Sequence, residues 1–117
     1  MPRFVILEHD HPELHWDLML QLDDKLRTWR LPAPPTGRPE TALEIGAHRS
    51  AYLDYEGPVS GNRGNVKRWD AGTYETIDAQ TSMEWTIELR GIRWQGTATM
   101  AHEHGQTWSI GFNATEH

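Results

Sequence analysis

An alternation of apolar and polar side chains with a period of two runs through much of this chain and limits what it can fold into. In the stretch LHWDLMLQL (Leu14–Leu22) every second residue is apolar, whereas a histidine and an aspartate stand between them. Successive side chains of a β-strand point to opposite faces, so this is the pattern of a strand with one buried face. No window carries the apolar stripe of an amphipathic helix. The sequence therefore predicts an all-β protein, an antiparallel barrel or sandwich of about eight short strands with little helix.

Turn-forming residues divide the chain into strands and loops. Asp23–Asp24 predicts a tight hairpin turn, and Pro32–Pro39 predicts a loop because proline cannot donate a hydrogen bond to a sheet. A single helical turn is expected over Asp10–Glu13. The other expected elements are strands at Arg3–Leu7, Leu14–Leu22, Lys25–Leu31 and Ala42–Ala47, a hairpin pivoting on Ala71–Gly72, a turn at Arg90–Gly91 and a last strand at Gln106–Phe112 with Trp108, Ile110 and Phe112 inward.

Length and composition narrow the class of protein. A chain of 117 residues is typical of one domain, and we expect a single domain over residues 1–117. The chain has no cysteine, so a tightly bound metal ion would need histidine, aspartate or glutamate ligands. No apolar stretch is long enough to span a bilayer and no secretion signal is recognisable, which predicts a cytoplasmic protein without a membrane partner.

The formal charge is unevenly distributed. The whole chain carries −6, but between Lys25 and Arg68 eight basic residues stand against four acidic ones, so that this segment carries +4 and the rest −10. Such asymmetry permits a basic patch for nucleic acid on an acidic protein. From charge alone an ordinary solvated surface is the simpler interpretation, and both stay open.

Metal-binding side chains are concentrated beside the first expected strand. The stretch EHDHPELHWDL (Glu8–Leu18) contains three of the seven histidines and four carboxylates. His15 and Asp17 are two residues apart on a strand and share one face, and the loop before them lets His9 fold back to join them. Two imidazoles and a carboxylate would form a mixed site for Mn²⁺, Fe²⁺ or Zn²⁺. The alternative is the polar face of an edge strand that collects such residues without a ligand.

Two chemistries could use such a site. A metal ion could polarise a phosphoryl oxygen for hydrolysis. Alternatively, His15, Asp17 and the distant His102 have the order of the two-histidine, one-carboxylate triad of iron oxygenases, but no lysine or arginine follows His102 to anchor an oxoacid co-substrate. His102 and His104 also share a strand face, although such a pair is more often the solvated end of a hairpin.

Four motifs follow one another in a specific order along the chain. They are FVILEHDHPELHWDLMLQLDDKLRTWRLP (Phe4–Pro32), HRSAYLDYEG (His48–Gly57), VKRWDAGTYE (Val66–Glu75) and TIELRGIRWQGTATM (Thr86–Met100). Together they resemble the 3′-phosphoesterase domain of bacterial DNA ligase D, and the ordered series is more specific than any one motif. The resemblance implies a compact antiparallel β-barrel that uses Mn²⁺, Zn²⁺ or another divalent ion.

The resemblance also implies roles for individual residues. It places metal ligands at His9, His15 and Asp17, and catalytic or phosphate-contacting residues at His48 and Tyr52. A protonated His48 would stabilise the transition state or protonate the leaving oxygen, while Tyr52 would donate a hydrogen bond to a phosphoryl oxygen. The implied reaction is removal of a 3′-phosphate or a 3′-terminal ribonucleotide in DNA end repair. The implied partners are DNA or RNA/DNA 3′ ends and other end-joining proteins, and we expect a monomer.

Two basic residues of the family pattern are missing. Met19 stands where the family has arginine, and Ala33 where it has lysine, which removes a bidentate phosphate contact. Arg49, Arg30 or Arg27 could supply a replacement guanidinium. Three interpretations stay open: a phosphoesterase of DNA 3′ ends, a phosphoesterase with a different phosphoester substrate, and a metal- or nucleic-acid-binding relative with little or no catalysis.

Overall fold

β-Strands make up almost all of the regular structure. The computed structural model describes residues 1–81 and 83–115, and within them one four-residue 3-10 helix accompanies nine strands, which confirms the all-β prediction. The elements are β1 (Arg3–His9), β2 (His15–Leu22), β3 (Lys25–Leu31), β4 (Pro39–Arg49), η1 (Ser50–Leu53), β5 (Gly57–Pro58), β6 (Asn65–Thr81), β7 (Glu84–Gly91), β8 (Gln95–His104) and β9 (Thr107–Ala114). In the described part of the chain no helix has the length and apolar character needed to cross a membrane.

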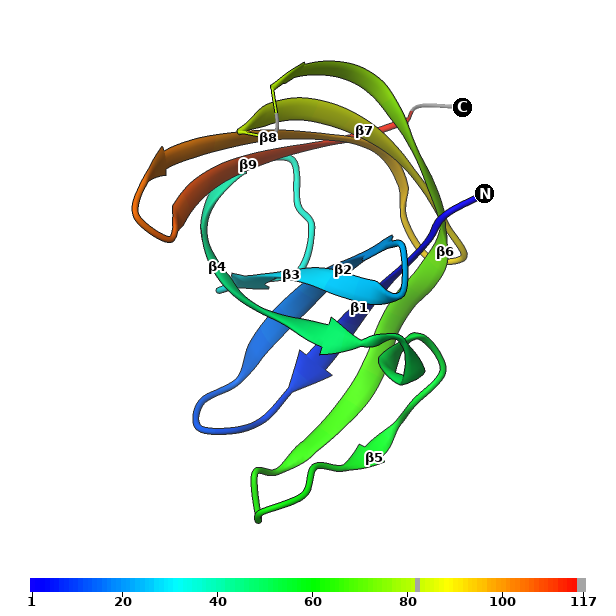
Figure 1. Ribbon diagram of the computed structural model, residues 1–117, viewed down its shortest axis with the longest axis vertical. Helices are drawn as coiled ribbons and strands as arrows, with labels where there is room; N and C mark the ends of the chain where they lie inside the picture. The colour runs from blue at the N-terminus through cyan, green and yellow to red at the C-terminus, as the bar shows by residue number, and fades with distance from the viewer. Residues whose placement is uncertain (82, 116–117) are drawn as a thin grey trace.

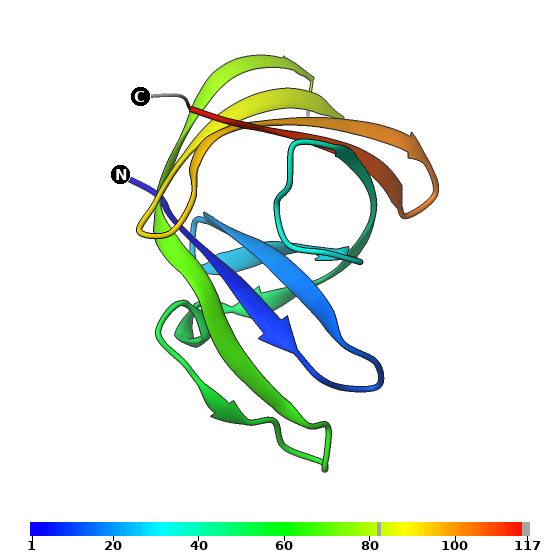
Figure 2. The ribbon, with the colours of Figure 1, turned by 180° about the vertical axis from the view of Figure 1, so that it is seen from behind.

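Eight of the strands close into an antiparallel barrel. Hydrogen-bonded neighbours follow the order β1-β2-β3-β4-β9-β8-β7-β6, and β6 also pairs with β1, which closes the ring. The short strand β5 pairs with the start of β6. In Figures 1 and 2, β6 is the long strand that runs from the tip beside β5, along β1, and into the upper sheet. The predicted barrel is confirmed, and its closure pairs the strand edges that an open sheet would expose.

The barrel lumen is filled by alternate side chains from all eight strands. At its centre the ring of Trp29 meets the ring of Trp108 edge to face, with centroids 5.5 Å apart, and lies 6.1 Å from that of Trp85. The inward orientation predicted for the last strand is confirmed. The fully buried large side chains of this core include Phe4, Ile6, Leu18, Leu20, Leu31, Ile87, Ile110 and Phe112. The lumen is therefore a packed apolar core and leaves ligand binding to the outer surface.

A smaller apolar cluster covers the outer face of β1, β2 and β3. It contains Val5, Leu7, Met19, Leu26, Leu53 and Val66, with Leu53 contributed by η1. Figure 1 shows η1 and β5 on the segment that follows β4, outside the barrel and beside β6. Because alternate residues of β1–β3 pack on the two sides, these strands are buried on both faces along part of their length. The outer cluster forms the floor on which the polar residues of β1 and β2 converge.

The predicted hairpin at Ala71–Gly72 is wrong, because β6 continues unbroken from Asn65 to Thr81. At Gly72 the strand pairs with Phe4 of β1 on one side and with Gly91 of β7 on the other. A Cβ at Gly72 would lie 2.0 Å from the carbonyl oxygen of Arg90. Glycine is therefore needed here for close approach of two strands and does not form a turn.

The turn between β7 and β8 lies at residues 92–94, beyond the predicted Arg90–Gly91. The buried carboxylate of Asp70 fixes it by accepting hydrogen bonds from backbone N–H groups: Oδ1 accepts from Ile92 and Arg93, both at 2.9 Å, and Oδ2 accepts from Trp94 at 2.8 Å. A charged acceptor satisfied by several donors in this way stabilises a turn strongly.

Other element boundaries also differ from the prediction. No helical turn forms over Asp10–Glu13, because Oδ1 of Asp10 accepts a hydrogen bond from the backbone N–H of Asn65 at 2.7 Å and ties the loop to β6. β4 is longer at each end than the predicted strand Ala42–Ala47. The expected apolar face of β2 is confirmed at its centre, but Leu14 and Leu22 at its two ends are exposed.

Candidate active site

Three candidate metal ligands meet on the outer face of the barrel. His9 ends β1, His15 begins β2, and the antiparallel register places the two residues directly opposite each other. Asp17 follows His15 on the same face of β2. One ligand atom from each residue lies within 4.8 Å of the others. Oδ2 of Asp17 is 3.3 Å from Nε2 of His15 and 3.9 Å from Nδ1 of His9, so the structure brings together the residues grouped from the sequence.

Backbone carbonyls orient both imidazoles for metal binding. Nδ1 of His15 donates to the carbonyl oxygen of Glu13, and Nε2 of His9 donates to that of Arg63, each at 2.8 Å. Because a carbonyl can only accept, the proton of each neutral ring lies on the bonded nitrogen, and the other nitrogen, which faces Asp17, is the one available to an ion. Nε2 of His15 and Oδ1 of Asp17 are buried without a hydrogen-bond partner among the described residues. This donor set of two nitrogens and a carboxylate fits a divalent ion.

The buried carboxylate of Asp17 dominates the electrostatics of the ligand cluster. The Asp17 carboxylate, whose Oδ2 lies 3.3 Å from Nε2 of His15, is the main cause that raises the pKa of His15, and burial opposes it. This carboxylate therefore favours a proton on His15. A metal ion at the same place would replace that proton, since a ligating imidazole must be neutral.

His48 and Tyr52 line a cavity that reaches two of the three candidate ligands, whereas His15 lines a neighbouring cavity. The first cavity has a volume of about 260 Å³, and its lining includes His9, Asp17 and Met19. His48 comes from β4 and Tyr52 from η1, and their rings meet edge to face with centroids 5.5 Å apart. Burial is the main cause that lowers the pKa of His48. Burial thus favours the neutral form of the imidazole, and the protonated His48 expected from the resemblance stays a prediction.

Sequence reasoning missed Thr28, which contacts the ring of His48. Thr28 is fully buried on β3, and its Oγ1 lies 3.0 Å from Nδ1 of His48. The contact forms beside a register shift between β3 and β4, where Leu26 pairs with His48 and Thr28 pairs with Ile45. Alternation places Thr28 on the same face as Leu26 of the outer cluster, but it does not indicate which strand lies beside His48.

The candidate site lies within a segment that matches a known protein family. The model of the DNA Ligase D 3′-phosphoesterase domain matches residues 7–102, which include every candidate ligand and both His48 and Tyr52. The chain belongs to the DNA ligase D 3′-phosphoesterase domain family. The relationship expected from the four sequence motifs is thereby confirmed.

Relatives of this phosphoesterase-family chain are large end-joining proteins. It is 32% identical over 82 residues to the multifunctional non-homologous end joining protein LigD of Pseudomonas aeruginosa, a match of 65% of this chain and 10% of that protein. It is 30% identical over 114 residues to the multifunctional non-homologous end joining DNA repair protein LigD of Mycobacterium tuberculosis, covering 90% of this chain and 15% of the relative. The LigD protein of Mycolicibacterium smegmatis is 28% identical over 125 residues, covering 91% and 16% respectively. The chain thus spans less than a fifth of the length of each of these relatives.

The three candidate phosphate-binding arginines of this family member lie in different places. Arg30 lines the cavity, directly across from Asp17 on the neighbouring strand, and its buried Nε has no partner among the described residues. Arg49 lines an adjoining cavity. Arg27 points to the opposite face, where its guanidinium bonds to Glu44 at 2.6 Å and lies 4.8 Å from the ring of Trp29. Arg30 is therefore the candidate that reaches the ligand cluster.

Arg63 belongs to this site, whereas His102 lies outside it. Arg63, which sequence reasoning missed, lines the cavity and also supplies the carbonyl that orients His9. His102 on β8 does not line the cavity: its Nε2 bonds to the carbonyl of Gly105 at 2.8 Å, and its ring packs against Trp108. In the described residues, the one group of three potential ligands close enough to share an ion is His9, His15 and Asp17. This arrangement gives no support to the oxygenase interpretation.

Proposed function

We propose that this chain is a divalent-metal-dependent phosphoesterase that removes a 3′-phosphate or a 3′-terminal ribonucleotide from DNA ends, with Mn²⁺ or Zn²⁺ as its ion. The observation that carries the proposal is the convergence, on one cavity, of two members of the three-ligand cluster with the imidazole of His48, the phenol of Tyr52 and the guanidinium of Arg30. Membership of the phosphoesterase family supports the reaction class. The end-joining names of its relatives support DNA ends as the substrate.

The ligand cluster and Arg30 would bind the phosphate. An ion held by His9, His15 and Asp17 supplies Lewis-acid polarisation of a phosphoryl oxygen when bound. The Arg30 guanidinium, one residue across the sheet from Asp17, offers hydrogen bonds and positive charge to the remaining phosphoryl oxygens. It would thereby replace the arginine that the family pattern has at the position of Met19.

His48 and Tyr52 would act on the reacting atoms. The attacking water forms a bond to phosphorus while the bond to the 3′-oxygen breaks, which leaves a 3′-hydroxyl. The other product is inorganic phosphate from a 3′-phosphate end and a nucleoside 5′-phosphate from a 3′-terminal ribonucleotide. A neutral His48 can accept a proton from the attacking water and return one to the leaving oxygen. The Tyr52 hydroxyl would donate a hydrogen bond to a phosphoryl oxygen as charge develops there.

Hydrolysis of a primer–template with a 3′-phosphate or a 3′-terminal ribonucleotide tests the proposal. The wild-type protein should release product with Mn²⁺, and chelation should stop the reaction. His48→Ala and His15→Ala should both lose turnover, whereas His102→Ala, a histidine outside the cavity, should keep it. Turnover that survives chelation or both substitutions would contradict the proposal. Metal binding without hydrolysis of either substrate would favour a different phosphoester or a binding module.

A further inference from the structure

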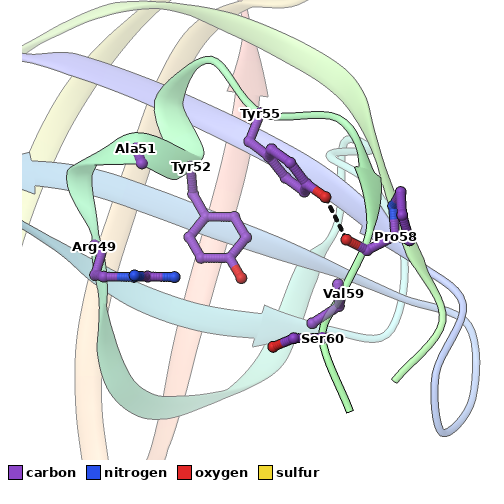
Figure 3. Close-up of a pocket in the computed structure, with 7 residues that line it drawn as sticks. All are labelled: Arg49, Ala51, Tyr52, Tyr55, Pro58, Val59 and Ser60. Carbon is purple, nitrogen blue, oxygen red and sulfur yellow. Dashed lines mark hydrogen bonds between the residues drawn. The ribbon is translucent and has the colours of Figure 1, made fainter. Parts of the chain in front are cut away.

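A second cavity adjoins the candidate active site. It has a volume of about 220 Å³ and shares Tyr52 and Val59 with the cavity lined by His9, Asp17 and His48. Figure 3 shows Arg49 and Tyr52 on one wall, with Tyr55 and the segment Pro58–Ser60 across from them. The two cavities are therefore neighbouring compartments separated by a wall that contains Tyr52.

A row of aromatic rings connects the two compartments. The rings of His48, Tyr52 and Tyr55 follow one another edge to face, with centroid separations of 5.5 and 5.7 Å. Tyr55 is 37% exposed, and its hydroxyl donates to the carbonyl oxygen of Pro58, which holds the ring at the rim of the second cavity. An exposed and tethered aromatic ring is a suitable surface for stacking, because little conformational freedom is lost on binding.

The charges around both cavities suit a nucleic acid. Arg49 is exposed, and no ion pair joins it to another residue of the described chain. Arg63 lines the first cavity and donates from Nη2 to Oγ of Ser60, at 3.2 Å, in the second. Asp17 is the one carboxylate among the described residues that line the two compartments, and it belongs to the ligand cluster. A polyanion would therefore meet arginines and little negative charge.

We propose that the second cavity binds the nucleobase of the 3′-terminal nucleoside, the one whose 3′-oxygen carries the phosphate. This inference rests on the proposed function and names the part of the substrate that the neighbouring compartment holds. Base and 3′-phosphate are attached to one sugar, so a sugar at the shared wall of Tyr52 and Val59 directs the phosphate to the ligand cluster and the base toward Tyr55. Stacking on a tyrosine accepts any base, which suits the repair of ends of any sequence.

The test compares two 3′-phosphorylated primer–templates, one with a normal terminal nucleotide and one whose terminal sugar lacks a base. The wild-type protein should lose about 5- to 150-fold in kcat/KM on the abasic end, the range expected for one stacked base. Tyr55→Leu should lose a similar factor on the normal end and process the abasic end as well as the wild type does. Tyr55→Phe is the matched control: it removes the hydrogen bond to Pro58, keeps the ring and should keep the preference for a base.

Binding separates this inference from the proposed function. Affinities for the same two DNAs are measured by fluorescence anisotropy in chelator, where neither is cleaved. Tighter binding of the normal end by the wild type, lost in Tyr55→Leu, supports the base site even if no hydrolysis is found with Mn²⁺. Equal binding and equal turnover of both ends by the wild type overturn the base site and leave the phosphoesterase proposal standing.

Discussion

Nδ1 of His48 lies 3.0 Å from Oγ1 of Thr28, and the same hydroxyl lies 2.9 Å from the carbonyl oxygen of Leu26. The carbonyl can only accept, so the single hydroxyl proton goes to Leu26, and Oγ1 accepts from the protonated Nδ1 of His48. Nε2 is then the nitrogen of this ring that can accept a proton. Thr28 is fully buried and thereby sets the tautomer of the proposed catalytic imidazole.

Replacing Thr28 with valine removes this hydrogen bond and keeps the shape of the side chain. We expect kcat for the proposed reaction to fall about 10- to 100-fold, as for other residues that orient an imidazole, while Mn²⁺ affinity is unchanged. Thr28→Ser keeps the hydroxyl and should keep most of the activity. Steady-state kinetics and calorimetric Mn²⁺ titration check both variants, and a Thr28→Val protein with wild-type kcat would show that the contact has no role in turnover.

Metal binding should depend on the ligand cluster alone. His15→Ala removes a buried nitrogen ligand, and we expect Mn²⁺ affinity to fall by more than about 100-fold, beyond the effect of losing an outer hydrogen-bond partner. His48→Ala should bind Mn²⁺ normally, because it leaves all three ligands in place. Calorimetry on the two variants separates the roles, and normal Mn²⁺ binding by His15→Ala would refute the ligand assignment.

Arg30 and Arg27 are three residues apart on β3 but should behave differently. Arg30→Gln removes the guanidinium beside Asp17, and we expect kcat/KM for a 3′-phosphate to fall about 100-fold or more. Arg27→Gln should lower thermal stability with little effect on turnover, because Arg27 lies over the tryptophans of the core and bonds to Glu44. Kinetics and thermal unfolding of both variants check the contrast, and the reverse pattern would exclude Arg30 as the phosphate ligand.

Asp70 should be one of the most important residues for stability. Its buried carboxylate accepts hydrogen bonds from backbone N–H groups in the β7–β8 turn, and Asp70→Ala leaves those donors unsatisfied. We expect the free energy of unfolding to fall by about 3 kcal/mol, measured by denaturant titration. Asp78→Ala removes an exposed carboxylate from the same strand and should change stability by less than about 0.5 kcal/mol. Similar losses in the two variants would contradict this account.

Stability should decrease at alkaline pH because of Tyr74. Burial raises the pKa of this phenol above its ordinary value of 10.0, and its hydroxyl donates to the carbonyl of Gln21 at 2.7 Å. The folded state therefore holds the proton more tightly than the unfolded state. This contribution is fully present below pH 10 and is lost as the pH rises through the folded-state pKa. Unfolding of Tyr74→Phe across this range should show a weaker dependence on pH than the wild type, and identical profiles would assign the effect elsewhere.

The alternation of side chains along a strand predicted the centre of the site, because this alternation depends only on the local sequence. His15 and Asp17 share a face of β2 whatever lies beside that strand, and His9 joins them because β1 and β2 form a hairpin. Thr28 could not be found in this way, since the sequence does not say which strand lies beside His48. Arg63 contributes a carbonyl oxygen, a group that every residue has, so its side chain carries no signal of that role.

The same reasoning explains the errors in the fold. Glycine is typical of turns, but the role of Gly72 is to let β6 and β7 approach closely, which depends on how the two strands pair. Alternation along the strand does separate the two arginines. Arg27 shares its face with Trp29 and Leu31, whereas Arg30 shares its face with Leu26 and Thr28. Which face forms the lumen and which carries the site follows only from closure of the barrel.

The tryptophan-filled lumen has a consequence for how this architecture can change. Because side chains fill the lumen, the candidate site lies on the outer wall of the barrel, beside the segment from Ser50 to Asn65. That segment supplies Tyr52, Tyr55 and Arg63. Replacing it with another sequence would change the substrate that the candidate site accepts, while the barrel folds as before. β1–β3 have less freedom, because their buried side chains pack into the lumen on one face and into the outer cluster on the other. The barrel and the segment beside it can thus be varied separately.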